Sequence, residues 1–192
     1  MTRLPFAALL ALAAGLATPS AADEFAPRLR ALYQERVAEI LADPVIIAAL
    51  RAANAAHAGL SQAEIDSLDR AWRDEVSAAH RPTIDPVLSN PASDRLRAVR
   101  DAAEGLFTEI FVMDNRGLNV AASDVTSDYW QGDEAKWQQT FAIGPGSIHI
   151  SDVELDESSQ AYQAQLSVTI TDPDTGAAIG AATFGVNVEY LD

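Results

Sequence analysis

The chain has 192 residues, 13 Lys and Arg against 28 Asp and Glu, a formal net charge of −15 and no Cys. Its 48% of apolar residues is normal for one globular domain and excludes wholesale disorder. The acidic balance excludes nucleic acid and anionic lipid as partners, because both need a basic surface, and the lack of Cys excludes disulfides and thiolate chemistry.

The first 22 residues have the pattern of a cleavable signal peptide. Arg3 is the only charge before Asp23, an apolar run extends over 6–16, and small residues precede the cleavage site expected after Ala22. The run is shorter than the roughly 20 residues that span a bilayer. An uncleaved anchor or a buried helix is the alternative. We expect a soluble protein, periplasmic or secreted, with no membrane insertion.

Residues 23–105 are predicted to form a helical region, because Ala, Leu, Arg and Glu dominate it. Asp43-Pro44 predicts a cap and the first turn of a helix. Ser61-Gln62-Ala63-Glu64 is a capping box. Asn90-Pro91 predicts a turn before a short helix over 94–104. Behind the capping box, apolar residues recur at helical spacing at Ile65, Leu68, Trp72 and Val76.

From residue 106 the pattern changes to that of strands. Phe107–Met113 and 118–122 are predicted to pair as a hairpin around the turn Asp114–Gly117. Further strands are predicted at 148–155, 161–171 and 178–190, and a short helix at 134–141. The segment Asp172–Gly176 is interpreted as a tight turn between the last two strands, since it lacks the downstream Glu of a calcium loop.

These elements predict an α+β fold of one folding unit. A long N-terminal helical region, 23–105, precedes a five-stranded antiparallel sheet within 106–192. We expect the helices to cover one face of the sheet and the segment 123–147 to cover the other. A sheet face that is closed by a loop is a typical place for a small-molecule pocket.

The segment 123–140 concentrates the residues that could carry chemistry. It holds Tyr129, Trp130 and Trp137, and its Lys136 is the only Lys of the chain. Aromatic side chains suit a cavity wall. Lys136 could hold a ligand carboxylate, and the acids Asp128 or Asp133 could hold an ammonium group. The alternative is a lid whose Trp side chains complete the core, with Lys136 paired to Glu134 or Asp133.

The remaining polar residues give weaker signals. His57, His80 and His149 have no metal-ligand spacing, so no metal site and no cofactor are predicted. Acids also alternate along the strand predicted at 148–155, which is typical of a solvated edge. Together with the acids of 123–140 they could instead bind a polyamine or a divalent cation. No nucleophile or phosphate-loop motif occurs, and we predict that the protein is not an enzyme.

The chain from Phe107 to Leu191 resembles a single Cache domain, a PAS-like, PDC-type extracytoplasmic sensor domain. Phe107–Ser123 resembles the first hairpin of that family, and Lys136-Trp137-Gln138-Gln139 resembles its pocket-lining Arg-x-Trp-Tyr element. The segment Ile179–Val188 resembles its last strand with the Gly-Val-x-apolar pattern. The resemblance is looser over 24–105.

The resemblance implies a pocket for amino acids, carboxylates or amines between the sheet and the segment 123–147. By position, Trp130, Lys136 and Trp137 would line it, and Asp152, Asp156 and Asn187 would project from the sheet edge. Amino-acid-binding members carry Arg near Lys136 and Asp at Asn187. A neutral Asn does not hold an α-ammonium group by charge, which argues against an α-amino acid here.

The resemblance therefore predicts a soluble exported sensory or binding protein that relays or buffers a small polar metabolite. It implies a small-molecule ligand, with a membrane sensor or a second copy of the chain as further partners. The alternative is an accessory protein that docks on a membrane sensor, or dimerises through its helices, without a small ligand.

Overall fold

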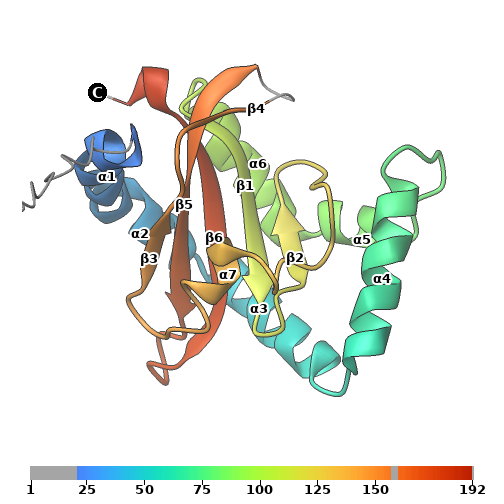
Figure 1. Ribbon diagram of the computed structural model, residues 1–192. Coiled ribbons are helices and arrows are strands. Elements are labelled where there is room, and N and C mark those ends of the chain that lie inside the picture. Colours follow the sequence, from blue (N-terminus) through green and yellow to red (C-terminus); the bar gives the residue numbers. More distant parts are fainter. Residues whose placement is uncertain (1–20, 157–159, 192) are drawn as a thin grey trace, which may run out of the picture.

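The computed structural model describes residues 21–156 and 160–191. Its centre is a six-stranded sheet of order β2-β1-β6-β5-β3, in which β4 also pairs with β5 (Figure 1). Every pair of neighbouring strands is antiparallel. The strands are β1 (Phe107–Asp114), β2 (Asn119–Ala122), β3 (Ile148–Ile150), β4 (Glu154–Asp156), β5 (Ala161–Thr171) and β6 (Ala178–Asn187).

The helices precede the sheet in the chain, apart from α7 and the final turn. They are α1 (Ala21–Leu32), a π-helical turn η1 (Tyr33–Val37), α2 (Ala38–Leu41), α3 (Pro44–His57), α4 (Gln62–Glu75), α5 (Ile84–Leu88), α6 (Pro91–Ala102), α7 (Ala135–Gln138) and a 3₁₀ turn η2 (Val188–Tyr190). Within the described residues, no helix is long and apolar enough to cross a membrane. The predicted signal peptide lies outside them except for Ala21 and Ala22, where α1 begins.

The predicted helix caps are confirmed. The Asp43 carboxylate accepts from the backbone N–H of Val45 at 2.9 Å, ahead of Pro44. Ser61 and Glu64 form both hydrogen bonds of the capping box at the start of α4. The Asn90 side chain accepts from the N–H of Ser93 at 3.0 Å, so α6 begins three residues earlier than predicted. Each cap satisfies a backbone donor that the first helical turn leaves open.

Strand periodicity divides the side chains of the sheet between two faces. On one face, apolar side chains pack against α1, α2, α3 and α6 in the main core. The strands contribute to this core through Ile110, Val112, Leu166, Val168, Ile170, Ala182, Phe184 and Val186. Helices on one face of an antiparallel sheet make the predicted α+β fold, which is confirmed.

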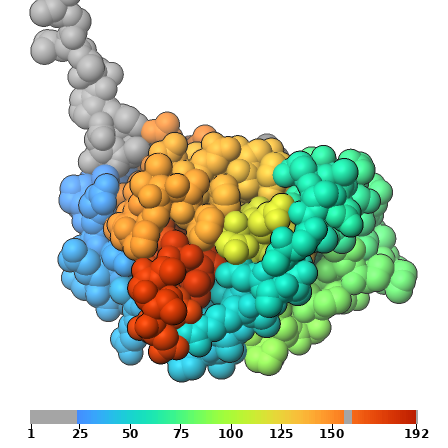
Figure 2. Space-filling view, turned by 90° about the horizontal axis from the view of Figure 1, so that it is seen from below, coloured from blue at the N-terminus to red at the C-terminus, as the bar shows by residue number. Residues whose placement is uncertain are grey.

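The opposite face is covered by the segment 123–147, as predicted. Trp137 and Phe141 pack there against Phe111 and Met113. A third cluster joins α4 and α5 to this segment. At one end of the molecule, the β1–β2 turn lies enclosed between α4 and the segment that carries α7, and the β5–β6 turn lies beside α3 (Figure 2).

The structure corrects three boundaries. The strand predicted at 148–155 is interrupted, because the Ser151 hydroxyl accepts from the N–H of Gln165 at 2.8 Å, so five predicted strands become six. The last strand ends at Asn187, whose side chain caps η2. The predicted stripe of α4 ends before Val76, which lies past the last turn and is 44% exposed.

Candidate functional site

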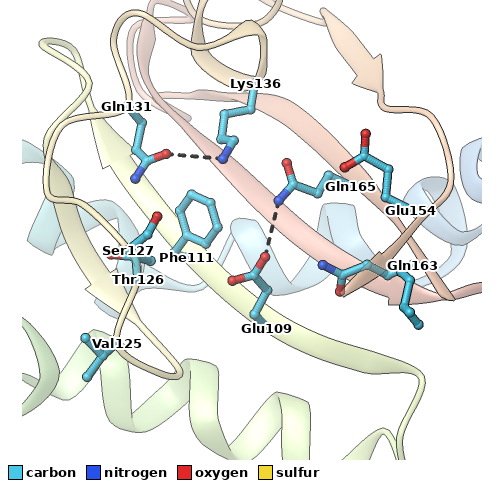
Figure 3. Close-up of a pocket in the computed structure, with 11 residues that line it drawn as sticks. Glu109, Phe111, Val125, Thr126, Ser127, Gln131, Lys136, Glu154, Gln163 and Gln165 are labelled. Atoms are coloured by element: carbon cyan, nitrogen blue, oxygen red, sulfur yellow. Dashed lines mark hydrogen bonds between the residues drawn. The ribbon is translucent and has the colours of Figure 1, made fainter. Parts of the chain in front are cut away.

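A cavity of about 490 Å³ lies on the sheet face opposite the main core (Figure 3). Strands β1, β4 and β5 form one side of it, and the segment 125–136 forms the other. Phe111, Thr126 and Gln131 are buried, whereas Ser127, Glu154 and Leu155 are exposed. The full lining is Glu109, Phe111, Val125, Thr126, Ser127, Gln131, Lys136, Glu154, Leu155, Gln163 and Gln165.

The sheet side of the cavity follows from strand alternation. Glu109 and Phe111 are two residues apart on β1, and Gln163 and Gln165 are two apart on β5, so each pair faces the cavity. Between these strands, Gly185 of β6 is the register partner of both Glu109 and Gln165. Gln165 Nε2 donates to Glu109 Oε1 at 3.3 Å above it. The floor of the cavity is therefore a hydrogen-bonded polar surface.

The loop side of the cavity is arranged around Lys136. Its Nζ lies 2.8 Å from Glu134 Oε2 and donates to Gln131 Oε1 at 3.2 Å. The same ammonium lies 5.4 Å from the centroid of the Phe111 ring, within cation–π range. Only 14% of the Lys136 side chain is exposed. Lys136 is thus a half-buried cation in the cavity wall.

Helix α4 holds this loop in place. Trp72 Nε1 donates to the Thr126 carbonyl at 2.8 Å, and the Trp72 ring stacks on Tyr129 at 5.1 Å. The buried Asp69 carboxylate accepts from the N–H groups of Tyr129 and Trp130. The lining residue Thr126 is therefore positioned by a helix that does not itself line the cavity.

A smaller cavity of about 250 Å³ adjoins the first and shares four of its lining residues, Lys136, Glu154, Gln163 and Gln165. Glu134, Ser151 and Asp152 complete its lining. The two cavities form one continuous polar surface over β4 and β5, with Lys136 on both.

The electrostatic environment at the edge of this surface is acidic. Burial raises the pKa of the Asp128 carboxyl above its ordinary value. Repulsion from Glu134 raises this pKa further and outweighs the attraction of Lys136 for the same carboxylate.

Two of the nine residues predicted to bind a ligand lie on these cavities, and so does Glu154 from the predicted strand of alternating acids. Lys136 lines both, and Asp152 lines the smaller one. The predicted aromatic walls lie elsewhere. Trp130 Nε1 donates to the Arg116 carbonyl and Trp137 Nε1 to the Asp114 carbonyl, so both indoles brace the β1–β2 turn.

The other predicted residues are also placed outside the cavity lining. Tyr129 is buried against Trp72, where burial and then the charge of Asp114 raise its pKa to about 12. Asn187 Oδ1 accepts from the N–H of Glu189 at 3.0 Å and caps η2, so the amide is used by the backbone.

The predicted acids divide between the protein interior and the surface. Asp128 contacts Gln131 and lies 3.6 Å from Arg73, and Asp133 is exposed. Asp156 closes β4 opposite Ala161, and its side chain lies outside the description. In the part of the chain that the structure describes, no three His, Asp or Glu gather as a metal site.

Sequence reasoning missed the sheet side of the cavity, namely Glu109, Gln163 and Gln165. A signal was present, because β5 alternates strictly between polar and apolar residues from Gln163 to Thr169. Such alternation marks a strand with one polar face. The meeting of that face with β1 depends on the intervening β6, which local pattern does not reveal.

No protein-family model matches the chain, and no curated protein matches it. Sensor domains are among the solved structures with a similar fold. The sensor domain of the V. cholerae histidine kinase DctB is 13% identical, with a TM-score of 0.47 over 88% of this chain and 57% of that chain.

Two chemoreceptor domains are similar at lower scores. The ligand-binding domain of Campylobacter jejuni Tlp3, in complex with 4-methylisoleucine, is 15% identical, with a TM-score of 0.40 over 87% of this chain and 61% of that chain. That of Pseudomonas fluorescens CtaA, in complex with L-valine, is 9% identical, with a TM-score of 0.39 over 68% and 54%. This chain therefore spans about half to three fifths of the length of these structures. Each of the three is described as a sensor or ligand-binding domain.

Proposed function

We propose that this protein is a sensory or binding domain that holds a small polar metabolite in the cavity over β1, β4 and β5. The observation that carries the proposal is the lining itself. Eight of its eleven side chains are polar or charged, and a volume of about 490 Å³ suits a metabolite-sized ligand. Phe111 adds an apolar contact to this polar lining, whose placed hydrogen-bonding groups would fix a ligand's orientation.

The wider setting belongs to the same proposal. A signal peptide over 1–22 would direct the chain to the periplasm or outside the cell. Residues 23–105 and 106–192 would act as one folding unit, which the main core shared by helices and strands supports. The protein would relay or buffer its ligand, with a membrane sensor or a second copy as its partner.

A thermal-shift screen of the purified chain tests the proposal. The panel would include amino acids, L-valine among them, carboxylates, amines and polyamines. A ligand at 100 times its Kd adds about 2.7 kcal/mol to stability, which shifts the melting temperature by several degrees. A hit would be followed by calorimetric titration of the wild type and of Gln165→Ala.

Gln165→Ala should weaken the binding of the hit, because it removes the amide that joins the two strand sides of the cavity. The matched control is Gln34→Ala, since Gln34 is exposed on η1, on the helical side of the sheet. Equal loss of affinity in both variants, or no hit across the panel, would contradict the proposal. The absence of any hit would favour the accessory role without a small ligand.

A further inference from the structure

The cavity lining holds more negative than positive side chains, and this difference indicates the charge of the ligand. Among the described residues that line it, Lys136 is the one cationic side chain, and Glu109 and Glu154 are anionic. Lys136 also has its own counter-ion in Glu134, at 2.8 Å. A ligand carboxylate at Lys136 would have to compete with Glu134, which is tethered two residues away.

The two sides of the cavity differ in character. Lys136 and Gln131 come from the loop side of the cavity, whereas Glu109, Gln165 and Glu154 come from the strands (Figure 3). Glu109 is half-buried on β1, where desolvation strengthens its attraction for a cation. Two carboxylates on one cavity wall favour a positive ligand over a negative one.

The surroundings of the Lys136 ammonium group also indicate that this cavity favours a positive charge. A carboxylate, an amide oxygen and an aromatic face surround Lys136 Nζ. All three are groups that bind cations. Because Lys136 already occupies these groups, the carboxylates that are left on the cavity lining for a second cation are those of Glu109 and Glu154.

We infer that the ligand is an organic monocation, an ammonium without a carboxylate group, with its charged end at Glu109 and Glu154. The inference rests on the proposed function and adds the ligand's charge to it. The glutamine amides Gln163 and Gln165 would then bind a hydroxyl or carbonyl group on the same molecule. Lys136 would exclude dications and long polyamines by repulsion.

A set of four-carbon compounds that differ in their charged groups tests this inference. The probes are 4-amino-1-butanol, putrescine, γ-aminobutyrate, 4-hydroxybutyrate and 1,4-butanediol, titrated into the purified chain by calorimetry at low salt. The monocation should bind most tightly and 4-hydroxybutyrate most weakly. Raising the salt concentration should weaken the binding of the monocation, because ions screen the attraction.

Variants of the charged lining residues test which side chains bind the ligand's positive charge. Glu109→Gln and Glu154→Gln should each weaken monocation binding about tenfold, because each removes a charged hydrogen-bond partner. Glu154 is exposed, so its variant retains the fold even if Glu109→Gln does not. The control Glu39→Gln, an exposed position on α2, should leave the affinity unchanged. Lys136→Met should raise the affinity for the monocation and should allow putrescine to bind.

The outcomes separate the two proposals. A preference for 4-hydroxybutyrate or γ-aminobutyrate that is lost in Lys136→Met would overturn the inference and leave the proposed function standing. The broad panel could give a hit although none of the four-carbon probes binds. A hit with one positive charge and no carboxylate group would then support the inference, and an anionic or zwitterionic hit would overturn it. No binding of any compound would overturn both.

Discussion

Glu109 and Gln165 hydrogen-bond at 3.3 Å although their strands, β1 and β5, are not neighbours. The strand between them, β6, carries Gly185 at the shared register position. A Cβ built on Gly185 would come within 2.8 Å of both Glu109 Cγ and Gln163 Oε1. The missing side chain is therefore what allows two distant strands to form one polar floor.

Gly185→Ala should destabilise the protein by about 1–3 kcal/mol, because a methyl group overpacks this position. It should also weaken ligand binding by displacing Glu109. Gly59→Ala is the control, since nothing lies within 4 Å of its added Cβ. We expect that change to stay within about 0.5 kcal/mol in urea unfolding. Equal stability of the two variants would contradict the proposed crowding at Gly185.

Trp72→Phe should cost about 1–3 kcal/mol of unfolding free energy. The substitution keeps an aromatic ring for the stack on Tyr129 but leaves the buried Thr126 carbonyl without its donor. Since Thr126 lines the cavity, ligand affinity should fall together with stability. Chemical denaturation and calorimetry measure the two effects. Unchanged values for both would show that α4 does not position the loop.

Asp114→Ala should be among the most damaging single changes in the β1–β2 turn. The Asp114 carboxylate is fully buried, accepts from the N–H groups of Arg116 and Leu118, and lies 2.5 Å from His57 Nδ1. Its removal leaves several buried polar groups without a partner, for about 2–4 kcal/mol. The exposed Asp133→Ala should be nearly neutral. Equal urea midpoints for the two variants would contradict the prediction that the Asp114 carboxylate stabilises the turn.

Arg51→Met should change the dependence of stability on pH. Arg51 hydrogen-bonds to Asp172, and this, together with backbone N–H groups, holds the pKa of that carboxyl well below its usual range. A carboxyl with a lowered folded-state pKa adds stability above its unfolded pKa, and this stability is lost as pH falls. The gap in unfolding free energy between wild type and variant should thus be largest near pH 7 and narrow below about pH 4.

The control for this pH dependence is Arg70→Met, at an exposed position on α4. Its stability should run parallel to that of the wild type across the pH range. A gap for Arg51→Met that stays constant from pH 7 to pH 3 would contradict the assigned role of Asp172.

The helices and their boundaries were accessible from the sequence, because caps are local. Asp43, Ser61 and Asn90 each bind a backbone N–H within three residues, so their residue types predict the geometry. Helix α5 was missed because it has five residues and carries Pro86 in its interior. The break between β3 and β4 depends on a side-chain bond from Ser151 to another strand, which local pattern does not show.

Of the residues predicted to bind a ligand, Lys136 and Asp152 line the two cavities. Lys136 is the only Lys, and it lines the cavity. The aromatic residues beside it left two interpretations open, a cavity wall or a lid that completes the core, because an indole can serve either equally well. Trp130 and Trp137 donate to the carbonyls of Arg116 and Asp114. That choice depends on tertiary contacts, as does the use of Asn187 as a cap.

The placement of the three Trp residues gives the molecule an optical reporter of its own. Each indole N–H donates to a backbone carbonyl, at Thr126, Arg116 or Asp114, so every indole is tied to the cavity loop or to the turn beside it. Emission colour and intensity depend on the polarity around an indole. Movement of the segment 123–147 on ligand entry would therefore register in intrinsic fluorescence, without a dye, and stopped-flow mixing could time it.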